Sequence, residues 1–147
     1  MTEFAVIDTD LGVIGLARST RGLVATTLPQ DNAEAAVSRL FRFVAPGTGL
    51  PLEVPSDAFG EIADSLACYA SGSSSRWTSS STWVRWSTFQ VRIWHATRTI
   101  PYGQTRSYAW VACEAGSPGA QRAAGQALHR NPLSLVVPCH RVIGADG

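Results

Sequence analysis

The chain of 147 residues contains no lysine, few charged residues and no long apolar run. Charged residues make up 16% of the sequence and hydrophobic residues 45%, which excludes a disordered chain and leaves enough apolar material for a core. Apolar runs are far too short to cross a membrane, and the acidic N-terminus is unlike a signal peptide. The three cysteines, an odd number at unrelated spacings, argue against a secreted disulfide scaffold. We therefore expect a cytoplasmic protein without a membrane partner.

The net charge of +1 conceals a difference between the two halves of the chain. Residues 1–85 hold six arginines against nine acids, whereas residues 86–147 hold six arginines against two acids. A basic segment joined to an acidic one is typical of a nucleic-acid-binding half with a separate supporting half. Surface charge also serves solubility, so the pattern alone leaves both interpretations open.

The first part of the chain predicts a small α+β domain over residues 1–70. Residues 4–28 are apolar and β-branched around glycines, which indicates two or three short strands joined by tight turns. Asp31 is the predicted N-cap of a helix with apolar residues at helical spacing. The Pro- and Gly-rich stretch 45–55 predicts a loop. Ser56 is the predicted N-cap of a second helix.

Residues 71–86 are nearly all Ser and Thr with interspersed Trp, and predict an atypical linker. The segment 87–147 then predicts a mostly helical domain. Helical spacing resumes at Ser87 and ends in a turn at residues 100–103.

Two further helices are predicted with a glycine-containing turn between them. Thr105 or Ser107 is the expected N-cap of the first, and Ser117 with Pro118 is expected to open the second, which spans residues 119–130. Such a pair is typical of a helix-turn-helix. Residues 133–137 then predict a short buried strand.

Cys139 and His140, directly after this predicted strand, carry the strongest chemical signal. A thiol becomes nucleophilic when deprotonated, and a neighbouring imidazole favours that state. Adjacent side chains on a strand point to opposite faces, so a turn is needed before the two can cooperate. A buried, inert cysteine is the alternative, and it is the expectation for Cys68 and Cys113.

A zinc site is a rival interpretation, and the spacing disfavours it because the sequence has neither a CxxC nor an HxxxH pair. We therefore expect no metal and no cofactor. The residues that such a site would use are Cys113, His129, Cys139 and His140.

Four segments occur in an order and at intervals that resemble a known family. They are Ile100-Pro-Tyr-Gly-Gln-Thr-Arg-Ser-Tyr108, Arg122-Ala-Ala-Gly125, Asn131-Pro132 and Val137-Pro-Cys-His-Arg-Val-Ile143. Together they resemble the O6-alkylguanine-DNA alkyltransferases, densely over residues 89–147 and weakly before them. The resemblance implies an α+β fold, in which a small strand and helix domain precedes a winged helix-turn-helix-like domain that carries the active cysteine.

The resemblance also implies residue roles. Cys139 matches the acceptor that takes the alkyl group from O6 of guanine once per molecule, with O4 of thymine as a second target. His140 matches the residue that helps to form the thiolate through a water, and Tyr108 the residue that hydrogen-bonds the departing guanine. Asn131 matches the residue that braces the turn around the active site.

The implied partner is double-stranded DNA containing O6-alkylguanine, bound by a monomer. Arg122 matches the arginine that enters the base stack, on a small-residue helix suited to close approach to the minor groove. The full set of implied DNA-binding residues is Thr105, Ser107, Arg122, Ala123, Gly125 and Arg141.

Two features depart from the family pattern. The sequence stops at Gly147, before the family's glycine-rich loop and the last helix, whose glutamate orients the histidine, so the expected proton relay is incomplete. Residues 72–86 do not match the family's aspartate-containing strand, and a pair of compensating frame slips is our hypothesis for that stretch. A DNA-damage-binding module without transfer and a Cys-His hydrolase remain alternatives, the latter disfavoured because no glycine-rich oxyanion turn lies beside Cys139.

Overall fold

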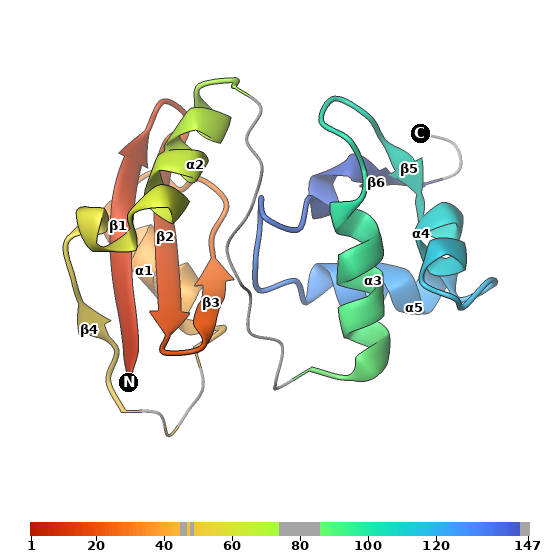
Figure 1. Ribbon diagram of the computed structural model, residues 1–147, viewed down its shortest axis with the longest axis horizontal. Coiled ribbons are helices and arrows are strands. Elements are labelled where there is room, and N and C mark those ends of the chain that lie inside the picture. The colour runs from red at the N-terminus through yellow and green to blue at the C-terminus, as the bar shows by residue number, and fades with distance from the viewer. Residues whose placement is uncertain (45–46, 48, 74–85, 145–147) are drawn as a thin grey trace. The chain divides into compact units, whose positions relative to one another are not determined.

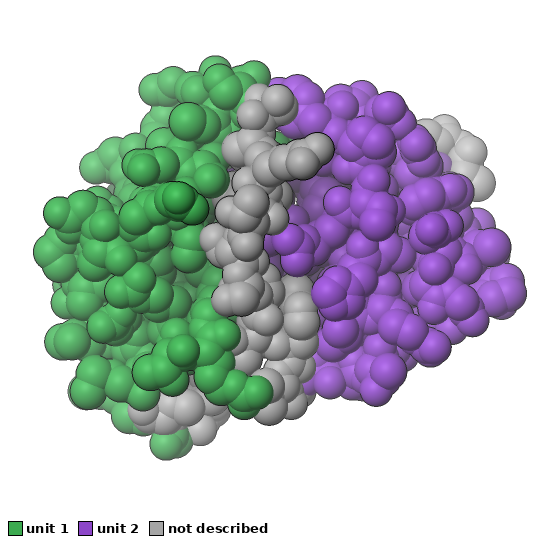
Figure 2. Space-filling model, viewed as in Figure 1, with its two compact units in different colours: residues 1–82 green, residues 83–147 purple. Residues whose placement is uncertain are grey.

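The computed structural model describes residues 1–44, 47, 49–73 and 86–144. The chain divides into two compact units, residues 1–82 and 83–147 (Figure 2). Most of the linker predicted over 71–86, and with it the frame-slip hypothesis, lies outside the described residues. No helix in the described part of the chain is long and apolar enough to cross a membrane.

Unit 1 is built on a four-stranded sheet in the order β3-β2-β1-β4. The strands β1 (Thr2–Thr9), β2 (Gly12–Ser19) and β3 (Gly22–Thr26) form two consecutive antiparallel hairpins, as predicted. Gly12 has a φ of 129°, and a Cβ there would lie 2.6 Å from the carbonyl oxygen of Gln30, so the first turn requires glycine. The short strand β4 (Leu52–Glu53) pairs in parallel with β1, inside the stretch for which the sequence predicted only a loop.

Helices α1 (Ala33–Phe41) and α2 (Glu61–Ala70) lie on opposite faces of this sheet (Figure 1). The central strand β2 is accordingly buried on both faces over residues 14–17. On the α1 face, Leu40 packs with three residues of the strands in one core cluster. These are Phe4, Ala17 and Ala25.

Both predicted helix caps in unit 1 are wrong. The backbone N–H of Ala35 donates to the side chain of Asn32 at 2.8 Å, so Asn32 caps α1 in place of Asp31. Ser56 opens a short 3-10 helix, Ser56–Phe59, rather than α2. Gly60 then reverses the chain with a φ of 51°, and α2 starts after it without a side-chain cap.

Unit 2 begins with α3 (Thr88–Arg98), whose start at Ser87 the sequence predicted. Ser87 and Gln90 form a capping box, in which each side chain bonds the other residue's backbone N–H. Ile93 and Trp94 are fully buried. The indole Nε1 of Trp94 donates to the carbonyl oxygen of Ala127 at 2.9 Å, which fixes α3 against the last helix.

Helices α4 (Tyr108–Glu114) and α5 (Gln121–His129) contact each other and α3 (Figure 1). Ser107 caps α4, because the backbone N–H of Trp110 donates to its hydroxyl at 3.0 Å. The prediction that Ser117 caps the second helix is wrong: a turn spans residues 117–120, and α5 begins only at Gln121. A short parallel pair, β5 (Arg106–Ser107) with β6 (Val142–Ile143), completes the α+β fold.

The corrected cap of α1 gives a direct test. Asn32→Ala is expected to lower the free energy of unfolding by about 1 kcal/mol, because the N–H of Ala35 loses its partner. Asp31→Ala is the matched control and should change that free energy by less than about 0.5 kcal/mol. Urea unfolding of the full chain measures both free energies of unfolding. Equal losses in the two variants would contradict the assignment of Asn32 as the cap.

Candidate functional site

The segment 133–137 is a buried turn, so the strand predicted there is wrong. The N–H of Val137 donates to the carbonyl oxygen of Leu133 at 2.8 Å, and Leu135 has a φ of 74°. A left-handed backbone is unfavourable for leucine and persists where surrounding contacts enforce it. A short apolar run looks the same in sequence whether it forms a strand or a buried turn.

Asn131 supplies the contacts that enforce this turn. Its side chain is buried, its Nδ2 donates to the carbonyl oxygen of Val137 at 2.9 Å, and its Oδ1 accepts from the N–H of Leu133 at 2.9 Å. One amide therefore closes the turn from both ends. The backbone that leads into Pro138 and Cys139 is fixed as a result.

Cys139 opens a single 3-10 turn, Cys139–Arg141, which we call the cysteine turn. The N–H of Cys139 donates to the carbonyl oxygen of Val137 at 2.8 Å, and the N–H of Arg141 to that of Pro138 at 2.9 Å. The sequence required a turn if Cys139 and His140 were to cooperate, and this turn is present. Cys139 is partly exposed.

The other two cysteines do not lie where the sequence placed them. Cys68 and Cys113 are exposed, so the expectation of core cysteines is wrong for both. Each lies on the outer side of a short amphipathic helix, α2 or α4. Apolar neighbours in sequence do not decide which side of a helix a residue occupies.

The pKa of His140 is lowered from the ordinary histidine value of 6.5. Partial burial of the imidazole is the larger cause, because burial penalises the charged ring. The positive charge of Arg141 lowers the pKa further. At neutral pH the ring is therefore mostly uncharged.

The guanidinium of Arg141 makes two contacts with other residues of the protein. Its Nη1 donates to the carbonyl oxygen of Ile100 at 3.0 Å, and its Cζ lies 5.4 Å from the ring centroid of Tyr102. The next residue, Val142, pairs with Arg106 across the β5–β6 ladder. The cysteine turn is thus joined to the segment that follows α3 and to β5.

A second group of the expected residues gathers around a mostly apolar hollow of about 350 Å³. It is lined by Tyr108, Gln121, Arg122 and Gly125. The ring of Tyr108 lies close to α5 at Gly125, where a Cβ would be in ordinary van der Waals contact with it, 3.6 Å from Cε1. Gln121 is a lining residue that the sequence analysis missed, because a lone glutamine at a helix start carries no motif signal.

The remaining DNA-binding candidates lie near this hollow along the chain. Arg122 and Ala123 are exposed in the first turn of α5, and Thr105 is exposed just before β5. Ser107 has its hydroxyl engaged as the cap of α4. The hollow's lining includes neither Cys139 nor His140, so the expected site residues form two groups within unit 2.

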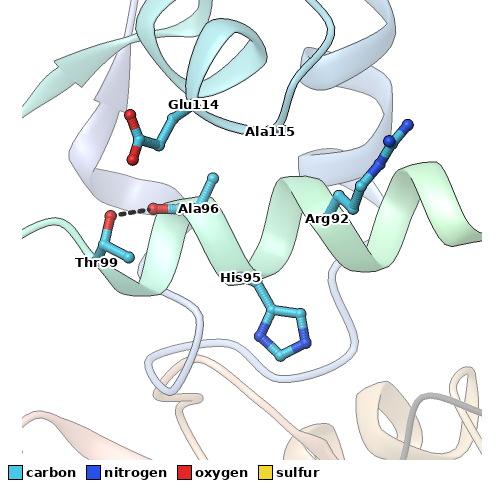
Figure 3. Close-up of a pocket in the computed structure, with 6 residues that line it drawn as sticks. All are labelled: Arg92, His95, Ala96, Thr99, Glu114 and Ala115. Carbon is cyan, nitrogen blue, oxygen red and sulfur yellow. Dashed lines mark hydrogen bonds between the residues drawn. The ribbon is translucent and has the colours of Figure 1, made fainter.

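A further hollow of about 300 Å³ lies between α3 and the end of α4 (Figure 3). Its lining includes Arg92, His95 and Glu114, and His95 points away from Glu114 in the close-up. Thr99 is engaged with the carbonyl oxygen of Ala96 at 2.6 Å. Among residues 1–44, 47, 49–73 and 86–144, no three His, Cys, Asp or Glu side chains gather as a metal site.

Comparison with known proteins gives consistent matches. Residues 88–147 match the model of the 6-O-methylguanine DNA methyltransferase DNA-binding domain. The whole chain is 40% identical to the methylated-DNA–protein-cysteine methyltransferase of Mycolicibacterium paratuberculosis and covers 81% of that protein. It matches the crystal structure of the Mycobacterium tuberculosis O6-methylguanine methyltransferase with a TM-score of 0.79 and 35% identity, covering 100% of this chain and 81% of that one.

A structure of the Mycobacterium tuberculosis protein OGT in complex with DNA is also similar. Its TM-score is 0.78 at 34% identity, with 99% of this chain and 80% of that chain covered. These matches extend over both units, although the sequence resemblance was dense only from residue 89 onward.

Removal of the Asn131 side chain tests the bracing of the turn. Asn131→Ala should lower the free energy of unfolding by about 2–4 kcal/mol, because a buried N–H and a buried carbonyl both lose their partner. Asn32→Ala, which removes one exposed cap, is the comparison and should cost about 1 kcal/mol. Urea unfolding of both variants measures the difference, and equal costs would contradict the bracing role.

The lowered pKa of His140 predicts a direction of pH dependence. The unfolded chain binds the proton more readily than the folded one, so the stability from neutral His140 is present above pH 6.5. It is lost as the pH falls through the folded-state pKa. An NMR titration of the His140 ring, assigned with His140→Asn, should give a midpoint below 6.5, and a midpoint at or above that value would contradict the assignment of causes.

Proposed function

This chain belongs to the methylated-DNA–protein-cysteine methyltransferase family, and we propose on that basis that it repairs DNA by transferring an alkyl group from a damaged base to its own Cys139. Membership rests on 40% identity over all 147 residues. The names of these relatives state methyl transfer between methylated DNA and a protein cysteine. These names do not say which of the three cysteines of this chain is the acceptor, so the choice of Cys139 is argued from the geometry of the site.

The observation that carries this choice is the cysteine turn. Cys139 is partly exposed at its start, beside a neutral His140, on a backbone that Asn131 fixes. It also lies inside the matched segment 88–147. Cys68 lies outside that segment, and Cys113, although inside it, lies in the last turn of α4 and has no histidine next to it in the sequence.

The transfer step balances with residues of this chain. The Cys139 proton passes to His140 through a water, and the resulting thiolate attacks the alkyl carbon on O6 of guanine in line. The carbon–sulfur bond forms as the carbon–oxygen bond breaks, and its electron pair remains on guanine. The Tyr108 hydroxyl donates a hydrogen bond to the departing base. The thioether is stable, so each molecule reacts once.

The base must leave the duplex before this step. O6 of guanine is paired and stacked, so a thiolate reaches its alkyl group only after the nucleotide has rotated out. Arg122, exposed beside the hollow at the start of α5, fills the space that the base leaves. Ala123 and Gly125 keep this part of the helix slim enough for close approach to the minor groove.

Contacts to the DNA backbone supply most of the affinity. Residues 86–147 carry six arginines against two acids, which favours the phosphates and makes binding sensitive to salt. Thr105 and the backbone around Ser107 flank the same helix pair. We propose a monomer that takes O6-alkylguanine, and O4-alkylthymine as a second target, without a cofactor.

Mass spectrometry after incubation with duplex DNA containing O6-methylguanine tests the proposal. The wild-type protein should gain one methyl group on Cys139, and Cys139→Ser should gain none, because the alcohol is a much weaker nucleophile than the thiolate. Cys68→Ser and Cys113→Ser are matched controls and should accept the methyl group as the wild type does.

Two outcomes would contradict this assignment. Binding of the damaged duplex without a gain in mass would indicate a DNA-damage-binding module. Methyl transfer that persists in Cys139→Ser but disappears in Cys113→Ser or Cys68→Ser would place the acceptor elsewhere.

A further inference from the structure

We propose that Arg141 is a positioning residue for alkyl transfer, which holds the cysteine turn against the segment after α3, and that it does not act by contacting DNA. The inference rests on the proposed function, because it concerns the same site. It differs from the role that the family resemblance suggests, in which Arg141 is one of the DNA-binding residues. Arginine near DNA usually binds phosphate, so a positioning role for Arg141 has to be supported by specific contacts within the protein.

The first contact is the hydrogen bond to Ile100. The Nη1 atom of Arg141 lies 3.0 Å from the carbonyl oxygen of Ile100, 41 positions earlier in the sequence. Ile100 is 2% exposed and lies just past the C-terminal end of α3. Carbonyls there lack intrahelical donors and attract positive charge, so a guanidinium is well suited to this position.

The second contact is with Tyr102. The guanidinium carbon lies 5.4 Å from the centroid of this ring, within the range of a cation–π interaction. Tyr102 belongs to a turn closed by the N–H of Gln104, which donates to the carbonyl oxygen of Pro101 at 3.1 Å. Arg141 is therefore packed against an ordered segment and is only partly exposed.

Other contacts fix the backbone on either side of the cysteine turn, and Arg141 adds one from within it. Asn131 fixes the backbone before Cys139, and the pairing of Val142 with Arg106 fixes the backbone after Arg141. Between them, Arg141 supplies a long-range side-chain hydrogen bond from within the turn itself. Arg141 also contributes, after burial of the ring, to the lowered pKa of His140, so its charge acts on this imidazole as well.

DNA contact and positioning predict different kinetics. A phosphate contact contributes to the Kd for any duplex. A positioning contact changes the rate after binding, since small displacements of a nucleophile slow an in-line displacement strongly. Arg122 and Arg130, which are exposed on or next to α5, are better placed for the first role.

The test compares Arg141→Gln and Arg141→Lys with the wild type. The Kd for undamaged duplex is measured by fluorescence anisotropy, and the rate of methyl transfer from duplex containing O6-methylguanine is measured in single turnover. Arg141→Gln should leave Kd within about twofold and lower the rate about tenfold, the loss expected for one hydrogen bond from a charged group. Arg141→Lys, which keeps the charge and a donor, should restore the rate to within about threefold of the wild type.

Two controls bracket this result. Arg21→Gln removes one charge from an exposed turn of unit 1 and should change neither quantity. Arg122→Gln should weaken DNA binding and so raise the Kd. A Kd weakened in Arg141→Gln in proportion to the rate, or a wild-type rate in that variant, would overturn the inference and leave the proposed function intact.

A second pair of variants decides the matter if Arg141→Gln does not fold. Tyr102 is 51% exposed, so its replacement should be tolerated. Tyr102→Ser should lower the transfer rate about threefold at constant Kd, because the guanidinium loses its ring contact, and Tyr102→Phe should retain the wild-type rate. Equal rates in these two variants would overturn the inference, and absence of transfer by the wild type would overturn both it and the proposed function.

Discussion

The pair of hydrogen bonds made by the buried side chain of Asn131 is the constraint on which the site depends. It closes a turn that contains a leucine in a left-handed conformation, and such a turn is unfavourable without an external clamp. Residues in a helix or sheet satisfy their backbone hydrogen bonds through regular pairing, which this irregular buried segment lacks. The side-chain amide of Asn131 acts as a donor and an acceptor to two of its backbone groups instead. The exposed edge of Cys139 follows directly from where that turn ends.

Two side-chain contacts likewise fix the proposed DNA-binding helix α5. The indole of Trp94 bonds the carbonyl oxygen of Ala127 near the end of α5, while the ring of Tyr108 lies against Gly125 near its middle. Gly125 also lines the hollow beside Arg122. Of the small residues on α5, alanine favours the helix and only Gly125 weakens it, so a slim surface is obtained with little loss of helix propensity.

Elements with strong local signals could be predicted from the sequence. The two glycine turns predicted the hairpins, and Ser107, one of the two caps expected for α4, marks its start, because these signals act within a few residues. Ser56 and Ser117 misled for the same reason: each lies at a turn just before a helix, and tertiary packing decides where the helix begins. The turn that ends at Val137 could not be distinguished from a strand, since its shape comes from the amide of Asn131.

Cys68 and Cys113 are exposed and Cys139 is partly exposed, which bears on how the proposed acceptor is selected. If exposure set reactivity, Cys68 and Cys113 would compete with Cys139 for small alkylating agents and for DNA lesions alike. An alkyl group on O6 of guanine is a poor electrophile, and in-line attack requires the base to be held at a fixed position relative to the sulfur. With Cys139 as the proposed acceptor, selection follows from the position of its sulfur relative to the proposed DNA-binding helix pair, which a rigid backbone around Cys139 fixes.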